Sequence, residues 1–191
     1  AFRHPVRGCH EARYFLCSRC EFVAARPADW LPRAYSAALA MTDTGVAARN
    51  YVVSEFLARF AWLAGLGGAR GLDIGGGHGL LVRLLRDRGL DFRWADRYAE
   101  NLLARGFEDD GGRYEWVTAV EVFEHLPEPR DFFVDVCARY RPQAVFFTTE
   151  VKRAPVPPED WWYWAFETGQ HIGFASARSL DLATQQLVVV A

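Results

Sequence analysis

A ten-residue stretch of the chain, Gly-Leu-Asp-Ile-Gly-Gly-Gly-His-Gly-Leu at 71–80, combines a carboxylate with closely spaced glycines. Leu72 and Ile74 predict a short buried strand, and the glycines predict a turn whose backbone can approach a ligand closely. The apolar pairs at 80–81 and 84–85 predict an amphipathic helix that ends at Gly89. We therefore expect a ligand site at this turn, formed by Asp73, Gly75, Gly76, Gly77 and Gly79.

The spacing of the glycines argues against a dinucleotide site. The fingerprint Gly-x-Gly-x-x-Gly, counted from Gly75, would need glycine at position 80, which is Leu80. Counted from Gly77, it would need glycine at position 82, which is Val82. This pattern disfavours a nicotinamide-dependent oxidoreductase.

Further acidic residues follow later strands. Asp96 ends the expected strand 92–96, and Glu121 lies near the end of the expected strand 114–122, within Glu-Val-Phe-Glu-His-Leu. Together with the glycine turn, these features resemble the class I S-adenosylmethionine-dependent methyltransferases over about residues 45–186. The resemblance implies that Asp73 and the glycines hold the methionine part of S-adenosylmethionine, that Asp96 binds the ribose hydroxyls, and that Arg97 lies against the adenine. Glu121 is expected on the same edge of the sheet, because ligands bind at the carboxyl ends of the strands.

Glu121, Glu124 and His125 have the i, i+3, i+4 spacing that places side chains on one helical face. His171 follows the next strand and can reach the same edge, where it could act as a general base. Two carboxylates and two imidazoles also suit a divalent metal. The set resembles the magnesium site of the small-RNA 3′-end ribose methyltransferases, but metal-free relatives carry the same stretch. We therefore favour direct roles of these four side chains in catalysis over the binding of Mg²⁺ or Mn²⁺.

The first 33 residues differ in character from the rest. Residues 13–23 predict a hairpin with Cys17-Ser-Arg-Cys20 at its turn, and such a pair can place two thiolates on one zinc ion. Cys9 would be a third ligand, and His4 or His10 a fourth, in a structural site. The alternative is a zinc-free hairpin with free or paired thiols.

The remaining pattern predicts a doubly wound α/β fold. Strands are expected at 71–74, 92–96, 114–122, 144–149 and 187–190, and helices at 33–40, from Asp43 or Thr44 to 66, and at 80–88, 98–104, 128–140 and 179–186. The fold class is therefore α/β, a Rossmann-like, mostly parallel sheet with helices on both faces, preceded by a small hairpin. We expect a hairpin module at 1–33 and a methyltransferase domain at 34–191.

The segment 152–169 is long for a plain connection and rich in proline and aromatic residues. We predict that its aromatic residues form a lid over the substrate, because it follows the ligand side of a strand. The alternative is that they cover the sheet as ordinary core. The predicted lid residues are Trp161, Trp162, Tyr163, Trp164 and Phe166.

Composition narrows the possible partners. The formal net charge of −2 over 191 residues offers no basic surplus for nucleic acid, and no run of 18 apolar residues predicts a membrane span. Four scattered cysteines do not resemble a secreted disulfide framework, which favours a cytoplasmic enzyme. The predicted function is methylation of a small molecule at oxygen or carbon. Alternatives are a metal-assisted RNA ribose 2′-O-methyltransferase and a non-catalytic S-adenosylmethionine-binding scaffold; the oligomeric state stays open.

Overall fold

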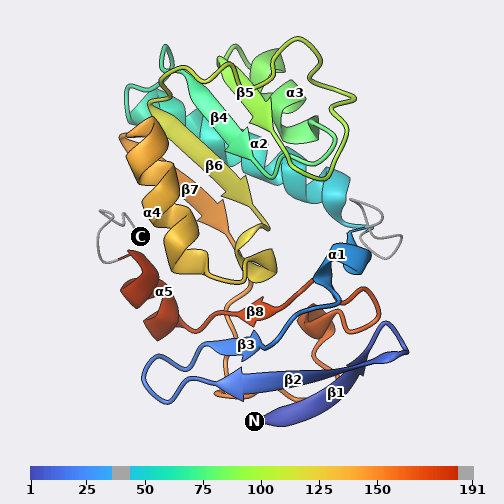
Figure 1. Ribbon diagram of the computed structural model, residues 1–191. Helices are drawn as coiled ribbons and strands as arrows, with labels where there is room; N and C mark the ends of the chain where they lie inside the picture. The colour runs from blue at the N-terminus through green and yellow to red at the C-terminus, as the bar shows by residue number, and fades with distance from the viewer. Residues whose placement is uncertain (36–43, 185–191) are drawn as a thin grey trace. The chain divides into compact units, whose positions relative to one another are not determined.

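A computed structural model describes residues 1–35 and 44–184 of the chain (Figure 1). The chain divides into two compact units that interleave along the sequence. Unit 1 contains Ala1–Ser36, Glu121–Asp135 and Thr148–Ala191, and unit 2 contains Ala37–Val120 and Val136–Phe147. This division differs from the predicted separation of 1–33 from 34–191, because two later segments share a unit with the N-terminal one.

Unit 2 is built on a four-stranded sheet in the order β5-β4-β6-β7. β4 (Gly71–Ile74) pairs in parallel with both β5 (Phe92–Ala95) and β6 (Trp116–Val120). β7 (Ala144–Thr148) forms one edge. On the other side of β5, Trp94 forms one parallel bridge with Glu108, so the segment 106–112 adds a single bridge to the sheet.

Helices α2 (Val46–Leu63) and α3 (Leu80–Asp87) pack together and bury one apolar core against this sheet. Leu57, Leu85 and Phe92 are fully buried in it. Burial of each such side chain contributes about 1.5–3 kcal/mol. The core also contains Leu81 and Trp116, so it joins both helices to the central strands.

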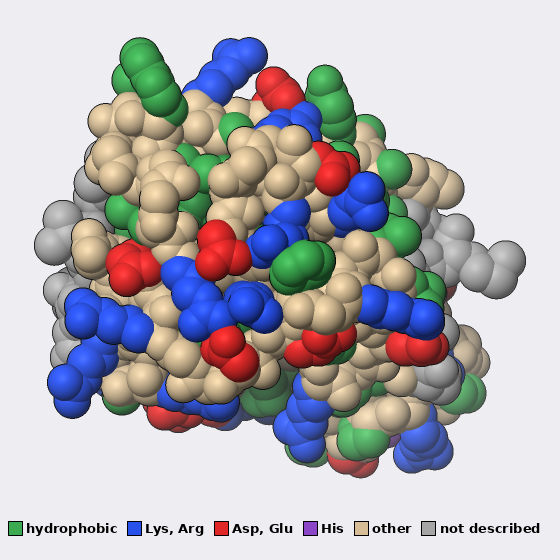
Figure 2. Space-filling view, turned by 90° about the horizontal axis from the view of Figure 1, so that it is seen from above, with side chains coloured by type: hydrophobic (Ala, Val, Ile, Leu, Met, Phe, Trp, Pro, Cys, Tyr) green, Lys and Arg blue, Asp and Glu red, His purple; other side chains and the backbone are tan. Residues whose placement is uncertain are grey.

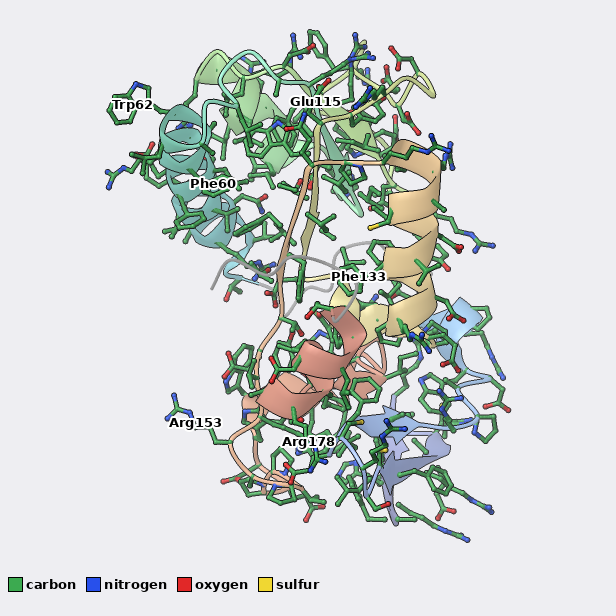
Figure 3. All side chains as sticks on the ribbon, turned by 90° about the vertical axis from the view of Figure 1, so that its left-hand side faces the viewer. Phe60, Trp62, Glu115, Phe133, Arg153 and Arg178 are labelled. Carbon is green, nitrogen blue, oxygen red and sulfur yellow. The ribbon has the colours of Figure 1, made fainter. Side chains whose placement is uncertain are left out.

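One face of α2 is exposed to solvent and carries large apolar side chains. Phe56, which lies three residues after the buried Val53, is 53% exposed, and Trp62 projects away from the helix (Figure 3). The buried face instead consists of Val53, Leu57 and Ala61. The helix begins after Gly45, without a side-chain cap from Thr44.

Unit 1 contains a second sheet, which is antiparallel and has the order β1-β2-β3-β8. β1 (Phe2–Val6), β2 (His10–Leu16) and β3 (Val23–Ala25) come from the N-terminal segment. β8 (Gly173–Phe174) comes from near the other end of the chain and pairs with β3. The predicted N-terminal hairpin therefore exists as the β2–β3 pair, but as part of a sheet that a distant segment completes.

The prediction that the aromatic segment 152–169 forms a substrate lid is wrong, because most of its aromatic side chains pack in the core of unit 1. Trp164 and Tyr163, from η2 (Trp162–Trp164), are about 1% exposed and belong to the core of unit 1 with Tyr14 and Phe174. The rings of Trp164 and Phe174 meet edge to face, with centroids 4.4 Å apart. The antiparallel sheet needs an apolar partner, and these aromatic side chains provide it. Only Trp162, which is 71% exposed, remains outside this core among the five predicted lid residues.

The predicted helix at 98–104 is also wrong. The backbone there is not helical, and side chains form hydrogen bonds with its N–H groups. Asp96 Oδ1 accepts hydrogen bonds from the N–H groups of Tyr98 and Ala99 at 2.7 and 2.8 Å. Asn101 Oδ1 accepts one from Ala104 N at 2.9 Å, and its amide donates to Ala104 O. Short polar side chains compete in this way with helical hydrogen bonds.

The remaining helices are α1 (Leu31–Ala34), α4 (Pro129–Tyr140) and α5 (Ala177–Thr184), with the short η1 (Phe123–His125). Most of the helix predicted at 33–40, the possible cap Asp43 and the strand predicted at 187–190 lie outside the described residues. Among the residues that are described, no helix has the length and apolar character needed to cross a membrane. Arginines and carboxylates alternate across the face seen in Figure 2.

Candidate active site

The glycine turn lies between β4 and α3, as the sequence predicted. Gly75, Gly77 and Gly79 have φ angles of 72°, 53° and 88°, in the left-handed region that favours glycine. The Trp94 indole N–H donates to Gly77 O at 2.8 Å, and Gly75 N donates to Ala95 O at 2.8 Å. The turn is therefore held from the neighbouring strand β5.

The turn also excludes side chains. A Cβ atom at Gly76 would lie 2.7 Å from Asp73 Oδ2 and 2.9 Å from Trp94 Cδ1. A Cβ atom at Gly79 would lie 2.9 Å from Asn101 Oδ1 and 3.0 Å from Ala104 Cβ. Close packing therefore requires glycine at position 76, and close packing and the φ of 88° both require it at position 79.

Asp73 is a buried carboxylate at the end of β4. It is 2% exposed and accepts a hydrogen bond from Thr118 Oγ1 at 2.6 Å. Burial, with the nearby Asp96 carboxylate, raises the pKa of Asp73 to about 7, against the opposing hydrogen bond from Thr118. A cation bound beside Asp73 would favour the charged carboxylate.

Asp96 is committed mainly to the protein itself. Its Oδ2 accepts a hydrogen bond from Gly77 N at 2.9 Å, while Oδ1 accepts the two N–H groups of Tyr98 and Ala99. A carboxylate has about four acceptor positions, so about one remains for a ligand. Binding both ribose hydroxyls, as predicted, requires the Gly77 hydrogen bond to be shared or released.

Arg97, predicted to lie against the adenine, and the later aspartates Asp109 and Asp110 have different surroundings. Arg97 is exposed and its guanidinium carbon lies 5.7 Å from the ring centroid of Tyr98. Asp110 pairs with Arg70, which precedes β4, and Asp109 accepts a hydrogen bond from Tyr114, which precedes β6. These contacts hold both aspartates by the amino ends of the strands, whereas the glycine turn follows a carboxyl end.

A second group of site residues belongs to unit 1. Glu121 follows β6 directly and has a φ of 54°, an uncommon conformation for a residue other than glycine. Its Oε1 accepts a hydrogen bond from Thr148 Oγ1 at 2.8 Å, and its Oε2 accepts one from the Tyr163 hydroxyl at 3.2 Å. Both carboxylate oxygens of Glu121 therefore have protein partners.

Glu124 differs from Glu121 in burial and in pairing. It has no solvent exposure, and Thr149 Oγ1 donates to its Oε2 at 3.2 Å. Its Oε1 is buried and has no hydrogen-bond partner. Burial, followed by repulsion from Glu121, raises the pKa of Glu124. A buried carboxylate oxygen without a partner is costly, so a proton or a ligand is expected at this atom.

Glu124, His125 and His171 come together, as the sequence predicted. One ligand atom from each lies within 4.8 Å of the others, and they form the single such group found in residues 1–35 and 44–184. The Nδ1 atoms of His125 and His171 face the carbonyl oxygens of Gln170 and Tyr163, at 3.0 and 2.7 Å. These bonds select the tautomers in which each Nε2 is an acceptor. Glu121 is absent from this group, so the predicted set of four side chains is reduced to three.

Burial, together with the neighbouring His125, lowers the pKa of His171. The neutral imidazole therefore persists below the pH at which an exposed histidine would be protonated. Nε2 of His171 is then able to accept a proton at neutral pH.

Tyr163 is the site residue that sequence reasoning assigned to the wrong role. Its hydroxyl donates a hydrogen bond to Glu121 Oε2 and accepts one from Glu150 N at 3.1 Å. Its carbonyl oxygen accepts a hydrogen bond from His171 Nδ1 and so orients the imidazole. Thr149 Oγ1 lies 3.2 Å from the same hydroxyl. The only available signal was its place in the aromatic segment, and that signal does not separate a buried polar hub from core packing.

The predicted zinc ligands do not gather. Cys9 lies in the turn before β2 and Cys17 in the turn after it, so the seven residues of β2 separate them. That length of strand spans about 20 Å. Cys17 and Cys20 share one turn, while His4 and His10 face Glu159 and Asp29. The zinc prediction thus keeps two neighbouring thiols and lacks its third described ligand.

Comparisons with known proteins identify the family of the chain. A family model described as "Methyltransferase domain" matches residues 46–187. One similar solved structure is that of the mitomycin 7-O-methyltransferase MmcR, with 17% identity and a TM-score of 0.41. The match covers 63% of this chain and 43% of that one. The search of curated proteins finds no match. By the family model, which spans most of its length, the chain belongs to the class I S-adenosylmethionine-dependent methyltransferase family.

Proposed function

We propose that this chain transfers a methyl group from S-adenosylmethionine to an oxygen or carbon atom of a small molecule. The observation that carries the proposal is the glycine turn, with the buried Asp73 before it and Asp96 Oδ2 on Gly77 N. The donor is a cation, and a cation beside the buried Asp73, whose pKa burial raises, would favour the charged carboxylate. The glycines leave room for backbone contact with the donor.

His171 is the proposed general base. Its Nδ1 is bonded to the Tyr163 carbonyl, so Nε2 can take the proton that an acceptor hydroxyl releases when it attacks the methyl group. The bond from the acceptor oxygen to the methyl carbon forms as the sulfur–methyl bond breaks. The proton then passes to Nε2, and a buried base of this kind is protected from water.

Charge supports a small acceptor over a polyanion. Glu121 and Glu124 place two carboxyl groups beside the base, and neither has an arginine or lysine among its described partners. A phosphate-rich acceptor would be repelled by ionised carboxylates. A neutral hydroxyl or ring compound meets no such repulsion.

The first test is calorimetric titration of the protein with S-adenosylhomocysteine, with Asp96→Ala as the variant and Asp87→Ala as a surface control. We expect micromolar binding and a loss of about 1–3 kcal/mol in the Asp96 variant, because it removes an acceptor and loosens the turn. Among the residues that the structure describes, the Asp87 side chain pairs with Arg83 at the surface, so its variant should bind normally. Absence of binding to the unmodified protein would contradict the proposed donor site, whereas binding without turnover on any acceptor would favour the non-catalytic S-adenosylmethionine-binding scaffold.

A second candidate is metal-assisted methylation, of which RNA ribose methylation is the predicted example. The observation in its favour is the orphaned Glu124 Oε1, with His125 Nε2 at 3.7 Å and His171 in the same group. Two imidazoles and one carboxylate fit a transition metal better than Mg²⁺, which prefers oxygen ligands. Such an ion would act as a Lewis acid toward the acceptor oxygen.

Metal analysis separates the two candidates. The protein is purified without chelator, its metal content is measured, and the measurement is repeated on Glu124→Gln and on Glu150→Gln as a control. Stoichiometric metal that disappears only in the Glu124 variant would establish the metal-assisted candidate. Activity that survives complete metal removal would leave His171 as the base.

A further inference from the structure

The long helix α2 carries a large exposed apolar face. Five large apolar side chains on this helix are more than half exposed: Tyr51, Val52, Phe56, Trp62 and Leu63. Trp62 and Leu63, at 81% and 76%, are the most exposed large apolar side chains among the described residues, and Figure 3 shows Trp62 pointing away from the helix. Large exposed apolar patches mark interaction sites.

The area of this face is close to what a stable dimer requires. A large side chain exposes on the order of 200 Å² when it is fully accessible, so the five exposed fractions correspond to roughly 600 Å². A typical stable interface buries about 800 Å² on each partner. The apolar side chains of α2 thus supply most of one partner's share of such an interface.

Two opposite charges lie within this face. One row along the helix has a spacing of four residues and consists of Tyr51, Glu55, Arg59 and Leu63. Arg88 Nε donates to Glu55 Oε1 at 2.9 Å, which fixes the carboxylate. Glu55 Oε2 lies 3.9 Å from the Arg59 guanidinium, which is too far for a hydrogen bond. An occupant of this face therefore has to bring a cation to Glu55 and an anion to Arg59.

A second copy of the same helix meets both requirements. When two copies of α2 pack antiparallel about a two-fold axis at the height of position 57, positions equally far from 57 face each other. Glu55 then faces the partner's Arg59, and by symmetry Arg59 faces the partner's Glu55. Tyr51 faces the partner's Leu63, and Val52 faces the partner's Trp62. The row is therefore complementary to itself in charge and in apolar contact.

We propose that the chain forms a homodimer in which α2 packs antiparallel against α2 of a second copy. The apolar side chains supply the affinity, and the two Glu55–Arg59 pairs fix the register of the helices. A membrane surface fits the face less well, because its anionic headgroups would pair with Arg59 but would repel Glu55. The inference is independent of methyl transfer.

Sedimentation velocity of the full chain tests the dimer. Interfaces of this size bind with micromolar or tighter affinity, so a species of twice the chain's mass should form between about 1 and 100 µM. Trp62→Ser should raise the dissociation constant at least about tenfold, because truncation of a buried interface tryptophan has a large effect. Val134→Ser, at a residue 44% exposed on α4, is the matched control and should leave the dissociation constant unchanged.

A charge exchange tests the register. Arg59→Glu and Glu55→Lys should each weaken self-association at least about tenfold, because like charges then face each other across the axis. An equimolar mixture of the two variants should recover the dimer, because each glutamate again faces a cationic side chain. Circular dichroism confirms that both variants are folded, which matters for Glu55→Lys because it removes the partner of Arg88.

Three outcomes would overturn the proposal. They are a chain that stays monomeric up to about 100 µM, a dimer that Trp62→Ser leaves intact, and charge variants whose mixture associates no better than either variant alone. A monomer that floats with vesicles of anionic phospholipid, and no longer floats after Trp62→Ser, would assign the face to a membrane surface instead.

Discussion

The glycine turn of unit 2 and the Glu–His group of unit 1 (Glu124, His125 and His171) differ in how their buried polar atoms are hydrogen-bonded. In the turn, Trp94 and Asp96 satisfy the backbone of Gly77 directly. In the Glu–His group, Glu124 Oε1 is fully buried and has no hydrogen-bond partner. A satisfied network is rigid before its ligand arrives, whereas an unsatisfied atom depends on a proton or ligand for its stability. The glycine turn is therefore preorganised, whereas the Glu–His group depends on a proton or a ligand.

The largest expected effect tests the chemical role of the Glu–His group. His171→Ala should reduce turnover about 10²–10⁴-fold, because it removes the proposed proton acceptor. Affinity for S-adenosylhomocysteine should stay within twofold of the unmodified protein. Single-turnover assays measure turnover, and calorimetry measures affinity. His78→Ala, in the glycine turn, is the comparison variant. Unchanged turnover in His171→Ala would remove this residue from the reaction.

The rigidity of the turn is tested by Gly79→Ala. The added Cβ meets Asn101 and Ala104 at 2.9–3.1 Å, and alanine is strained at a φ of 88°. We expect a loss of about 2–4 kcal/mol in the free energy of unfolding, measured by urea titration. Gly67→Ala is the control, because a Cβ there meets nothing within 4 Å. Equal losses in both variants would show that the turn is not specifically packed.

The same comparison shows which parts of the molecule a sequence can reveal. The turn is local: strand, glycines and helix follow one another within 71–87, so spacing alone identified it. The Glu–His group joins residues 124 and 125 to 171, and its members were identified individually. Their pairing with Tyr163 depends on how the segment 161–174 packs on the N-terminal sheet.

Long-range packing also explains the errors. The aromatic residues Trp161–Phe166 carried no signal to distinguish a lid from a core, because both uses favour large apolar rings. β8 is two residues long, so no periodicity could reveal that it completes a sheet with β3. In the segment 98–104, Asp96 and Asn101 replace helical hydrogen bonds with their own side chains.

The pH dependence of the free energy of unfolding tests whether burial raises the pKa of Asp73, the carboxylate before the glycine turn. Its pKa is about 7 in the folded protein and near 3.8 when unfolded, so the folded state binds the extra proton between these values. The resulting stabilisation is complete below about pH 4 and is lost as the pH rises through 7. The slope is at most about 1.4 kcal/mol per pH unit for one proton. Asp73→Asn should remove this slope from urea titrations at pH 5–7, whereas Asp87→Asn should retain it.

The smallest expected effect separates orientation from chemistry within the Glu–His group. Tyr163→Phe removes the hydroxyl from Glu121 and Glu150 but keeps the backbone carbonyl that orients His171. We expect a loss of about 1 kcal/mol in stability, typical of one hydrogen bond. Nitrogen-15 spectra of labelled histidine should show the same His171 tautomer in the variant. A changed tautomer would mean that the hydroxyl positions the entire segment. The two carboxylates and the base would then form one cooperative network, and the Glu–His group would be as preorganised as the turn.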